Sequence, residues 1–513
     1  MTSTRESRRS LTAPAPVTFD KAGQHERLEL ARGERVSKAQ ELAPELAKLV
    51  PLFFRHVPAE EVLEADPAAL AAIVRSHREL AEDRPQGRPK VRAFNPSRAE
   101  TGWSCPFTVV QIVTDDMPYL VDSVVAELTK AGAPAFRVIH PIVVVRRIVT
   151  GQLTDVLVDA DPVDPPEGAI AESWMYLEVG RVVDQEAVAV LEQRLNIVLT
   201  DVREVVEDSA RMASTARAIA DELEQDPPVG LPPREVTGGA EFLGWLADGH
   251  FTFLGYRRYE LIGTGDDGEP ALRAALASGL GVLRKDSLAA RSFTAGPGGK
   301  GMGSAEHVMS KELLVLTQAS VPSTVVRPVY PYYVGVKIFD ERGELSGEHR
   351  FLGMLTSTAL HENVLDIPVI KDRVYDVIHR AGFPLESHSG QRMLDVIQNY
   401  PRAELFSTDT DTLYVTVTGV LSLAERRALR LFLRRDQYNR FYSCLVYLPR
   451  DRYTTTSRLA MQDVLLRELS GHQLEYNARV GESELARVHF TVHTDPAATA
   501  NAQPDVVAIQ DLL

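Results

Sequence analysis

The apolar positions divide the chain into alternating helical and extended segments. A helical period runs through residues 26–81, within which Asp66 and the proline after it predict an N-cap and the start of a helix. The next stretch, "EDRPQGRPKVRAFNP", is charged and rich in proline and glycine. This composition predicts a boundary between two structural units.

A strand, a helix and a second strand are predicted next. "CPFTVVQIVTDD" is β-branched and almost continuously apolar, which is typical of a buried strand. In "TDDMPYLVDSVVAEL", Asp115 or Asp116 is expected to cap a helix whose first turn holds Pro118 and which ends at Gly132. "FRVIHPIVVVRRIV" then reads as a strand in which Pro141 requires an edge position or a bulge.

Two further units follow a long helix predicted over residues 184–226. In the first, "YPYYVGVKIFD" and "EHRFLGMLTS" form a hairpin of a mostly antiparallel sheet. In the second, "DTLYVTVTGVL" is predicted as a strand and "LAERRALRLFLRR" as a basic amphipathic helix. A strand, a helix and two strands complete it, and "PDVVAIQDLL" resembles the first turns of another helix, which suggests that the sequence is a fragment.

Composition narrows the classes of function. The 513 residues include 56 basic and 71 acidic side chains, a net charge of -15, which argues against nucleic-acid and membrane-surface partners. No stretch is long and apolar enough to span a bilayer. Cys105 and Cys444 lie far apart within apolar runs, so we interpret them as buried, inert thiols in a reducing cytoplasm.

Signals for catalysis are weak. "GPGGKGMGS" lacks the spacing of a phosphate-binding loop, and no glycine triplet lies between a strand and a helix, so no cofactor site is predicted. His361, His379 and His388 cluster loosely but do not form a metal-binding pattern, and we interpret them as solvated or core-packed. We therefore predict no catalytic and no metal-binding residue.

The acidic turn Asp115–Asp116–Met117–Pro118 is the one candidate binding site. Exposed N–H groups at a helix N-terminus attract a carboxylate, and a side-chain acid attracts an ammonium group. A free amino acid carries both groups on one carbon. The alternative interpretation is that one aspartate only caps the helix.

Several motifs resemble the N-terminal segment of the large-type bacterial NAD-specific glutamate dehydrogenases. They are, in order, "VPAEEV", "VRAFNP", "TDDMPYLVDSV", "HFTFLGYR", "RFLGMLTS", "IPVIKDRVYDVI" and "LRLFLRRDQYNRFYSCLVYLPRDRYTTTSR". The resemblance implies a regulatory half built of ACT-like domains and a PAS-like sensor domain, with the catalytic half absent here. It places Asp115 to Pro118 at the first strand-to-helix turn of an ACT domain, the usual amino-acid site. ACT domains typically have glycine near that turn, so a purely structural ACT fold stays open.

The expected fold class is α+β and multidomain, with ferredoxin-like βαβ ACT domains and a PAS-like antiparallel sheet joined by helices. The predicted segments are a disordered arm (1–25), a helical region (26–90), a first ACT-like domain with a long trailing helix (91–226), a PAS-like domain (235–360), a helical linker (361–402), a second ACT-like domain (403–495) and the start of a further segment (496–513).

The expected function is regulation and assembly of an NAD-dependent glutamate dehydrogenase, which converts L-glutamate, NAD and water to 2-oxoglutarate, ammonium and NADH. The implied partners are an amino-acid effector, the catalytic half of the same polypeptide and further copies in a homo-oligomer. NAD is implied only for the full-length enzyme, in the cytoplasm. The alternative is a stand-alone amino-acid-binding or scaffold protein without an attached enzyme.

Overall fold

The computed structural model describes most of the chain as two compact units. The described residues are 21–262, 271–284, 311–319, 321–423, 428–436, 438–481, 483–495 and 502–513. The first unit comprises the residues up to Pro118 together with Val124–Thr200, and the second comprises Tyr119–Ser123 and Asp201–Leu513. The predicted glycine-rich loop at 296–304 lies outside the described residues.

The first unit opens with a layer of helices. They are α1 (Lys21–Leu42), the 3-10 helix η1 (Pro44–Leu46), α2 (Leu49–Phe53), α3 (Ala59–Glu64) and α4 (Pro67–Leu80). The carboxylate of Asp66 accepts a hydrogen bond from the Ala68 N–H, and Pro67 is the first residue of α4, so the predicted cap is confirmed. The short helix α5 (Arg98–Thr101) follows the first strand.

A six-stranded antiparallel sheet forms the centre of this unit. Its strands are β1 (Lys90–Phe94), β2 (Thr108–Asp115), β3 (Ala135–Ile139), β4 (Ile142–Arg147), β5 (Leu153–Val156) and β6 (Ile170–Val179). The order is β1-β2-β6-β4-β5, and β3 also pairs with β6. Because β6 lies between β2 and β3, the helix α6 (Leu120–Lys130) connects them as a split βαβ unit. The single strand predicted across Pro141 is two strands, because β3 ends before His140 and β4 begins after Pro141.

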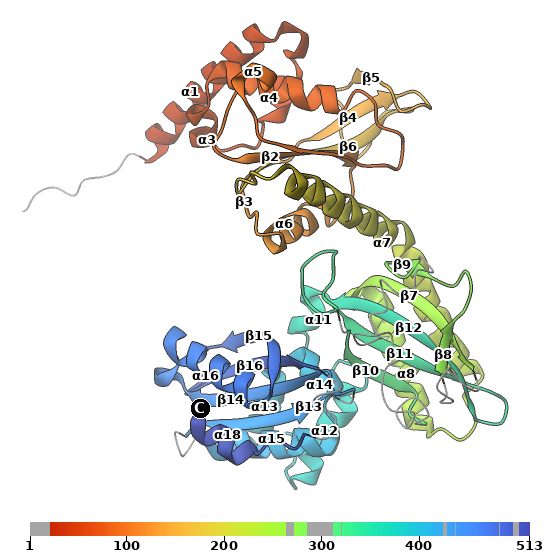
Figure 1. The fold of residues 1–513 in the computed structure, drawn as a ribbon. Coiled ribbons are helices and arrows are strands. Elements are labelled where there is room, and N and C mark those ends of the chain that lie inside the picture. The colour runs from red at the N-terminus through yellow and green to blue at the C-terminus, as the bar shows by residue number, and fades with distance from the viewer. Residues whose placement is uncertain are drawn as a thin grey trace, which may run out of the picture. The chain divides into compact units, whose positions relative to one another are not determined.

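Helices cover both faces of this sheet (Figure 1). Trp174 and Tyr176 of β6 pack with Phe53 and Ile73 in the core beneath the N-terminal helices. On the other face lie α6 and the start of the long helix α7 (Gln185–Gln225), and an ion pair between Arg194 and Glu127 joins these two helices. β6 is therefore buried on both sides from Glu172 to Val179, and its polar residues Glu172, Ser173 and Glu178 are buried with the rest.

The second unit contains a six-stranded antiparallel sheet in the region predicted to be PAS-like. The strands are β7 (Phe251–Ile262), β8 (Ala271–Ala274), β9 (Leu280–Gly281), β10 (Leu314–Gln318), β11 (Tyr332–Phe339) and β12 (Leu345–Leu355). The order is β10-β11-β12-β7-β8, with β9 paired to β7. The predicted hairpin of β11 and β12 is confirmed. Helix α8 (Pro233–Trp245) and the π-helical turn η2 (Leu246–His250) lead into β7.

A bundle of short helices follows this sheet. They are α11 (Ser357–His361), α12 (Ile370–Arg380), α13 (His388–Gln398), α14 (Arg402–Ser407) and α15 (Thr410–Leu423). The prediction of a strand at "DTLYVTVTGVL" is wrong, because this segment lies within α15. Its β-branched residues suggested a strand, yet Leu413, Val417 and Val420 recur at helical spacing and are buried in the core.

A four-stranded antiparallel sheet completes the second unit. Its elements are β13 (Arg430–Arg435), β14 (Phe441–Pro449), the 3-10 helix η3 (Arg450–Arg452), α16 (Thr455–Glu468), β15 (Gly471–Arg479), β16 (Leu485–Thr494) and α18 (Val506–Leu512). The strand order is β13-β14-β16-β15. The basic amphipathic helix predicted at "LAERRALRLFLRR" is wrong for its last six residues, which form β13. Leu429, Leu431 and Leu433 follow the period of two that a strand requires, and all three pack in one core.

The two thiols differ from the prediction in one respect. Cys444 is fully buried in β14, whereas Cys105 is only half-buried. Burial raises the pKa of both thiols. His361, His379 and His388 are exposed, which confirms the solvated interpretation.

Buried polar side chains join α14 to the last sheet. Arg434 donates to both carboxylate oxygens of Glu404, at 2.8 and 2.9 Å, and Nε2 of His489 lies 2.9 Å from the Ser443 hydroxyl. Burial opposes the charge of Glu404, but Arg434 outweighs it and lowers the Glu404 pKa to about 2. Burial lowers the pKa of His489 to about 4, against an ordinary value of 6.5. The imidazole is therefore neutral in the folded protein at neutral pH.

The buried His489 should make stability fall in acid. The unfolded chain binds a proton at this residue below pH 6.5 and the folded chain only below about 4. The free energy of unfolding contributed by His489 is thus complete above pH 6.5 and is lost between 6.5 and 4, by about 3 kcal/mol. Urea unfolding measured across this range should show a shallower decline in His489→Gln. The exposed His388→Gln is the control, and equal slopes in both variants would contradict the assignment.

Candidate functional site

The predicted turn lies between β2 and α6. Asp115 is the last residue of β2, and the N–H of Asp116 donates to the Ala171 carbonyl at 3.0 Å. Helix α6 begins at Leu120, and the Ser123 N–H bonds to the carbonyl of Tyr119, at 3.1 Å. The predicted capping by Asp115 or Asp116 is therefore wrong, because Tyr119 stands directly before the helix. Pro118 also precedes the helix instead of lying in its first turn.

Asp115 is paired with a protein cation. Its Oδ1 accepts a hydrogen bond from Nη2 of Arg84 at 2.6 Å, and the Arg84 side chain is completely buried. Nε and Nη2 of Arg84 also donate to Glu172, at 2.9 and 2.6 Å. Burial opposes the charge of Arg84, but Glu172 and Asp115 outweigh it and raise its pKa. Asp115 thus belongs to the internal structure of the unit.

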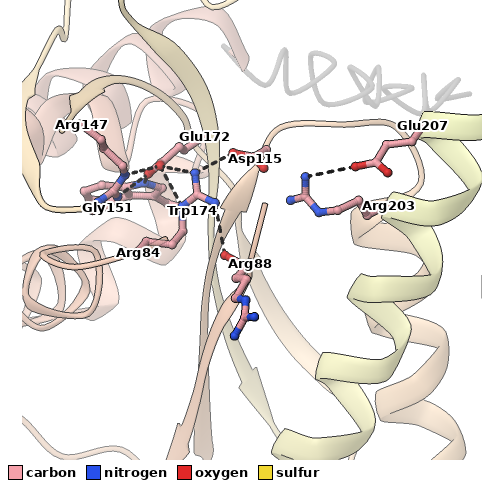
Figure 2. A network of polar contacts seen from close by, with 9 residues as sticks. All are labelled: Arg84, Arg88, Asp115, Arg147, Gly151, Glu172, Trp174, Arg203 and Glu207. Carbon is pink, nitrogen blue, oxygen red and sulfur yellow. Dashed lines mark hydrogen bonds and ion pairs between the residues drawn. The ribbon is translucent and has the colours of Figure 1, made fainter. Parts of the chain in front are cut away.

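Glu172 is the centre of this polar network (Figure 2). Its fully buried carboxylate also accepts hydrogen bonds from Arg147, at 2.6 and 2.8 Å, and from the indole N–H of Trp174, at 3.0 Å. The two arginines also donate hydrogen bonds to main-chain carbonyls. Arg84 donates to the carbonyl of Arg88, and Arg147 donates to that of Gly151. The network therefore ties the loop after α4 and the turn after β4 to the ends of β2 and β6.

Asp116 differs from its neighbour because its side chain is exposed. Among the described residues, no lysine, arginine or histidine forms an ion pair with it within 4.0 Å, the limit for such a pair. Partial desolvation raises the Asp116 pKa, and nearby His140 lowers it. Asp116 is thus the acid of the turn that a ligand can reach. Met117 is half-buried and Pro118 is exposed.

His140 and Ser173 extend the polar surroundings of the turn. Nε2 of His140, which follows β3, contacts the hydroxyl of Ser173 in β6. Burial lowers the His140 pKa, and the charge of Asp116 opposes that effect. No local sequence pattern marks these two residues, or Arg84 and Glu172, because the sheet brings them together from separate segments.

Neither a metal site nor a membrane span is found in the part of the chain that the structure describes. No group of three or more histidine, cysteine, aspartate or glutamate residues there could hold a metal ion. No helix among these residues is long and apolar enough to cross a bilayer.

Comparison with known proteins identifies the class of the domains. Residues 49–195 match the ACT1 domain of glutamate dehydrogenase, residues 367–426 its helical motif 1 and residues 430–513 its ACT2 domain. The turn at Asp115 to Pro118 thus lies within the ACT1 match. The chain is a multidomain α+β protein with two ACT domains.

Curated relatives agree with this class. The NAD-specific glutamate dehydrogenase of Halomonas elongata is 34% identical over 87% of this chain, that of Pseudomonas aeruginosa 32% over 90%, and that of Mycobacterium tuberculosis 35% over 76%. The aligned residues make up 27%, 28% and 22% of those proteins, so the chain spans about a quarter of their length. The chain belongs to the NAD-specific glutamate dehydrogenase family.

Neutralising Glu172 should destabilise the first unit. Glu172→Gln keeps the shape of the side chain but leaves Arg84 and Arg147 buried with too little opposing charge, so we expect a loss of about 3 to 5 kcal/mol in unfolding free energy. Asp116→Asn, the same chemical change at an exposed site, should stay within about 0.5 kcal/mol of wild type. Denaturant unfolding followed by tryptophan fluorescence measures both. Equal stability of the two variants would show that the network contributes little.

Proposed function

We propose that this chain is a regulatory and assembly segment of an NAD-specific glutamate dehydrogenase. The whole enzyme would convert L-glutamate, NAD and water to 2-oxoglutarate, ammonium and NADH. The proposal is supported by the matches to the ACT1, helical motif and ACT2 domains and by the names of the relatives. We propose no catalytic and no NAD-binding residue in this chain, and NAD serves the full-length enzyme.

We further propose that the turn from Asp115 to Pro118 binds an amino-acid effector. The single observation that carries this proposal is the exposed Asp116, which lies beside the start of α6 and forms no ion pair among the described residues. Its carboxylate would bind the ammonium group of the effector. The first N–H groups of α6 would receive the effector's carboxylate, because the helix dipole favours negative charge there.

The two aspartates have different proposed roles, and only Asp116 binds the ligand. Asp115 is held by Arg84 and maintains the shape of the turn, whereas Asp116 supplies the ligand-binding charge. The antiparallel sheet of β7–β12 is proposed as the PAS-like sensor domain. Copies of the chain would assemble into a homo-oligomer in the cytoplasm, joined to the catalytic part of the enzyme.

A panel of the twenty amino acids should include a ligand that stabilises the chain. We expect about 1 to 3 kcal/mol of stabilisation at saturation, measured as a shift of the thermal unfolding curve. Asp116→Asn should abolish the shift without lowering the unfolding temperature of the free protein. Asp164→Asn removes an exposed carboxylate elsewhere in the first unit and should leave the shift intact.

Two outcomes would contradict this assignment. If no amino acid shifts the wild-type curve, the turn is a structural part of the ACT domain and binds no effector. If a shift survives unchanged in Asp116→Asn, the effector binds elsewhere.

A further inference from the structure

The segment 321–331 between β10 and β11 is held in shape by its own hydrogen bonds. The Ser323 N–H bonds to the Val329 carbonyl at 2.9 Å. The Ser323 hydroxyl donates to the Val325 carbonyl at 2.8 Å and accepts from the Val325 N–H at 3.0 Å. Ser323 is buried and Val325 is completely inaccessible to solvent. These bonds link the two halves of the segment to each other.

One side of this segment is bonded to the first turn of α6. Residues 119–123, which include that turn, belong to the second unit, as the segment does. The Val326 N–H donates to the hydroxyl of Ser123 at 2.9 Å, and that hydroxyl donates to the carbonyl of Tyr119 at 2.6 Å. Thr324 adds a hydrogen bond to Asp201 of α7, at 2.8 Å. Ser123 is only 1% exposed, so water does not compete for these bonds.

The backbone is strained at both ends of this hydrogen-bond chain. Tyr119 has φ of 72° and Val326 has φ of 71°, in the left-handed region. For a β-branched residue such as valine this conformation is a genuine outlier, and it persists only where the surroundings compensate its cost. The bond from Val326 to Ser123 is one such compensation. Loss of this bond should therefore let Val326 leave the left-handed region.

The other side of the segment contacts the last sheet. The ring of Tyr330 stacks on His493 of β16, with centroids 4.1 Å apart and planes at 22°, and its hydroxyl lies 3.4 Å from Oε1 of Gln473 in β15. His493 is only 6% exposed. Tyr330 covers the ring together with Phe441 of β14, whose centroid lies 6.0 Å from that of His493, so the position of the segment affects the burial of His493.

We propose that segment 321–331 couples the first turn of α6 to the ACT2 sheet, with Ser123 as the positioning residue. This inference rests on the proposed function only for the identity of the signal. A ligand that accepts hydrogen bonds from the first N–H groups of α6 shifts the backbone at Tyr119. The Ser123 hydroxyl, which bonds to both residues, transmits that shift to Val326. Val326 then has two backbone conformations, one left-handed and one relaxed. The change between them moves Tyr330 relative to the His493 ring.

Ser123→Ala in the full chain tests the coupling without any ligand. Hydrogen–deuterium exchange of peptides within 321–331 should accelerate at least tenfold. Imidazole NMR should show the His493 pKa rising from about 4 toward its ordinary 6.5 as Tyr330 withdraws. Thr129→Ala, which removes an exposed hydroxyl further along α6, should change neither reading. Val326→Gly keeps the N–H donor and relieves the strain, so it should retain the wild-type His493 pKa.

The coupling is overturned if Ser123→Ala leaves both the exchange of 321–331 and the His493 pKa as in wild type. A second arm adds the amino acid that stabilises wild type most. It should slow exchange in 321–331 in wild type and not in Ser123→Ala, and an equal effect in both proteins would also overturn the proposal. If no amino acid stabilises wild type, the effector assignment fails, while the ligand-free arm still decides the coupling.

Discussion

A single buried carboxylate organises the first unit. Glu172 lies in the strand that pairs with β2, β3 and β4, and it binds two arginines from neighbouring segments and the tryptophan two residues further along its own strand. A buried charge is costly unless its partners satisfy it, so the strands and loops that deliver Arg84 and Arg147 must meet at this point. The ion pair between Asp115 and Arg84 holds the end of β2 at this point, and it thereby positions the turn that follows β2.

The same network gives the two neighbouring aspartates different environments. Side chains alternate between the faces of a strand, so Asp115 points to the face that carries Glu172, while the turn has already begun at Asp116. One acid therefore completes the interior and the other stays exposed beside α6. The turn lies within the ACT1 match, and Ser123, in the first turn of the helix that follows, accepts a hydrogen bond from Val326 in the segment before β11.

Local patterns in the sequence predict much of the fold. The helix α6, the hairpin of β11 and β12, and the long α7 follow from hydrophobic period and turn residues. The pattern mispredicts α15, just before the second ACT domain, because β-branched composition outweighs its helical period. It also mispredicts β13, the first strand of that domain, because a basic sequence conceals its alternation. The Arg84–Glu172 pair could not be predicted, since its members lie 88 residues apart and meet only when the sheet forms. The turn itself was predicted, but not which aspartate remains exposed.

The central claim is that the ammonium group of an amino acid binds Asp116, and His140 reports on it directly. The negative charge of Asp116 raises the His140 pKa against the effect of burial. The decisive measurement is the His140 pKa by imidazole NMR, with and without a saturating amino acid that stabilises the chain. If the ammonium group neutralises Asp116, the ligand lowers the His140 pKa, and Asp116→Asn removes the difference. A His140 pKa that a bound amino acid leaves unchanged would show that the ammonium group does not bind Asp116.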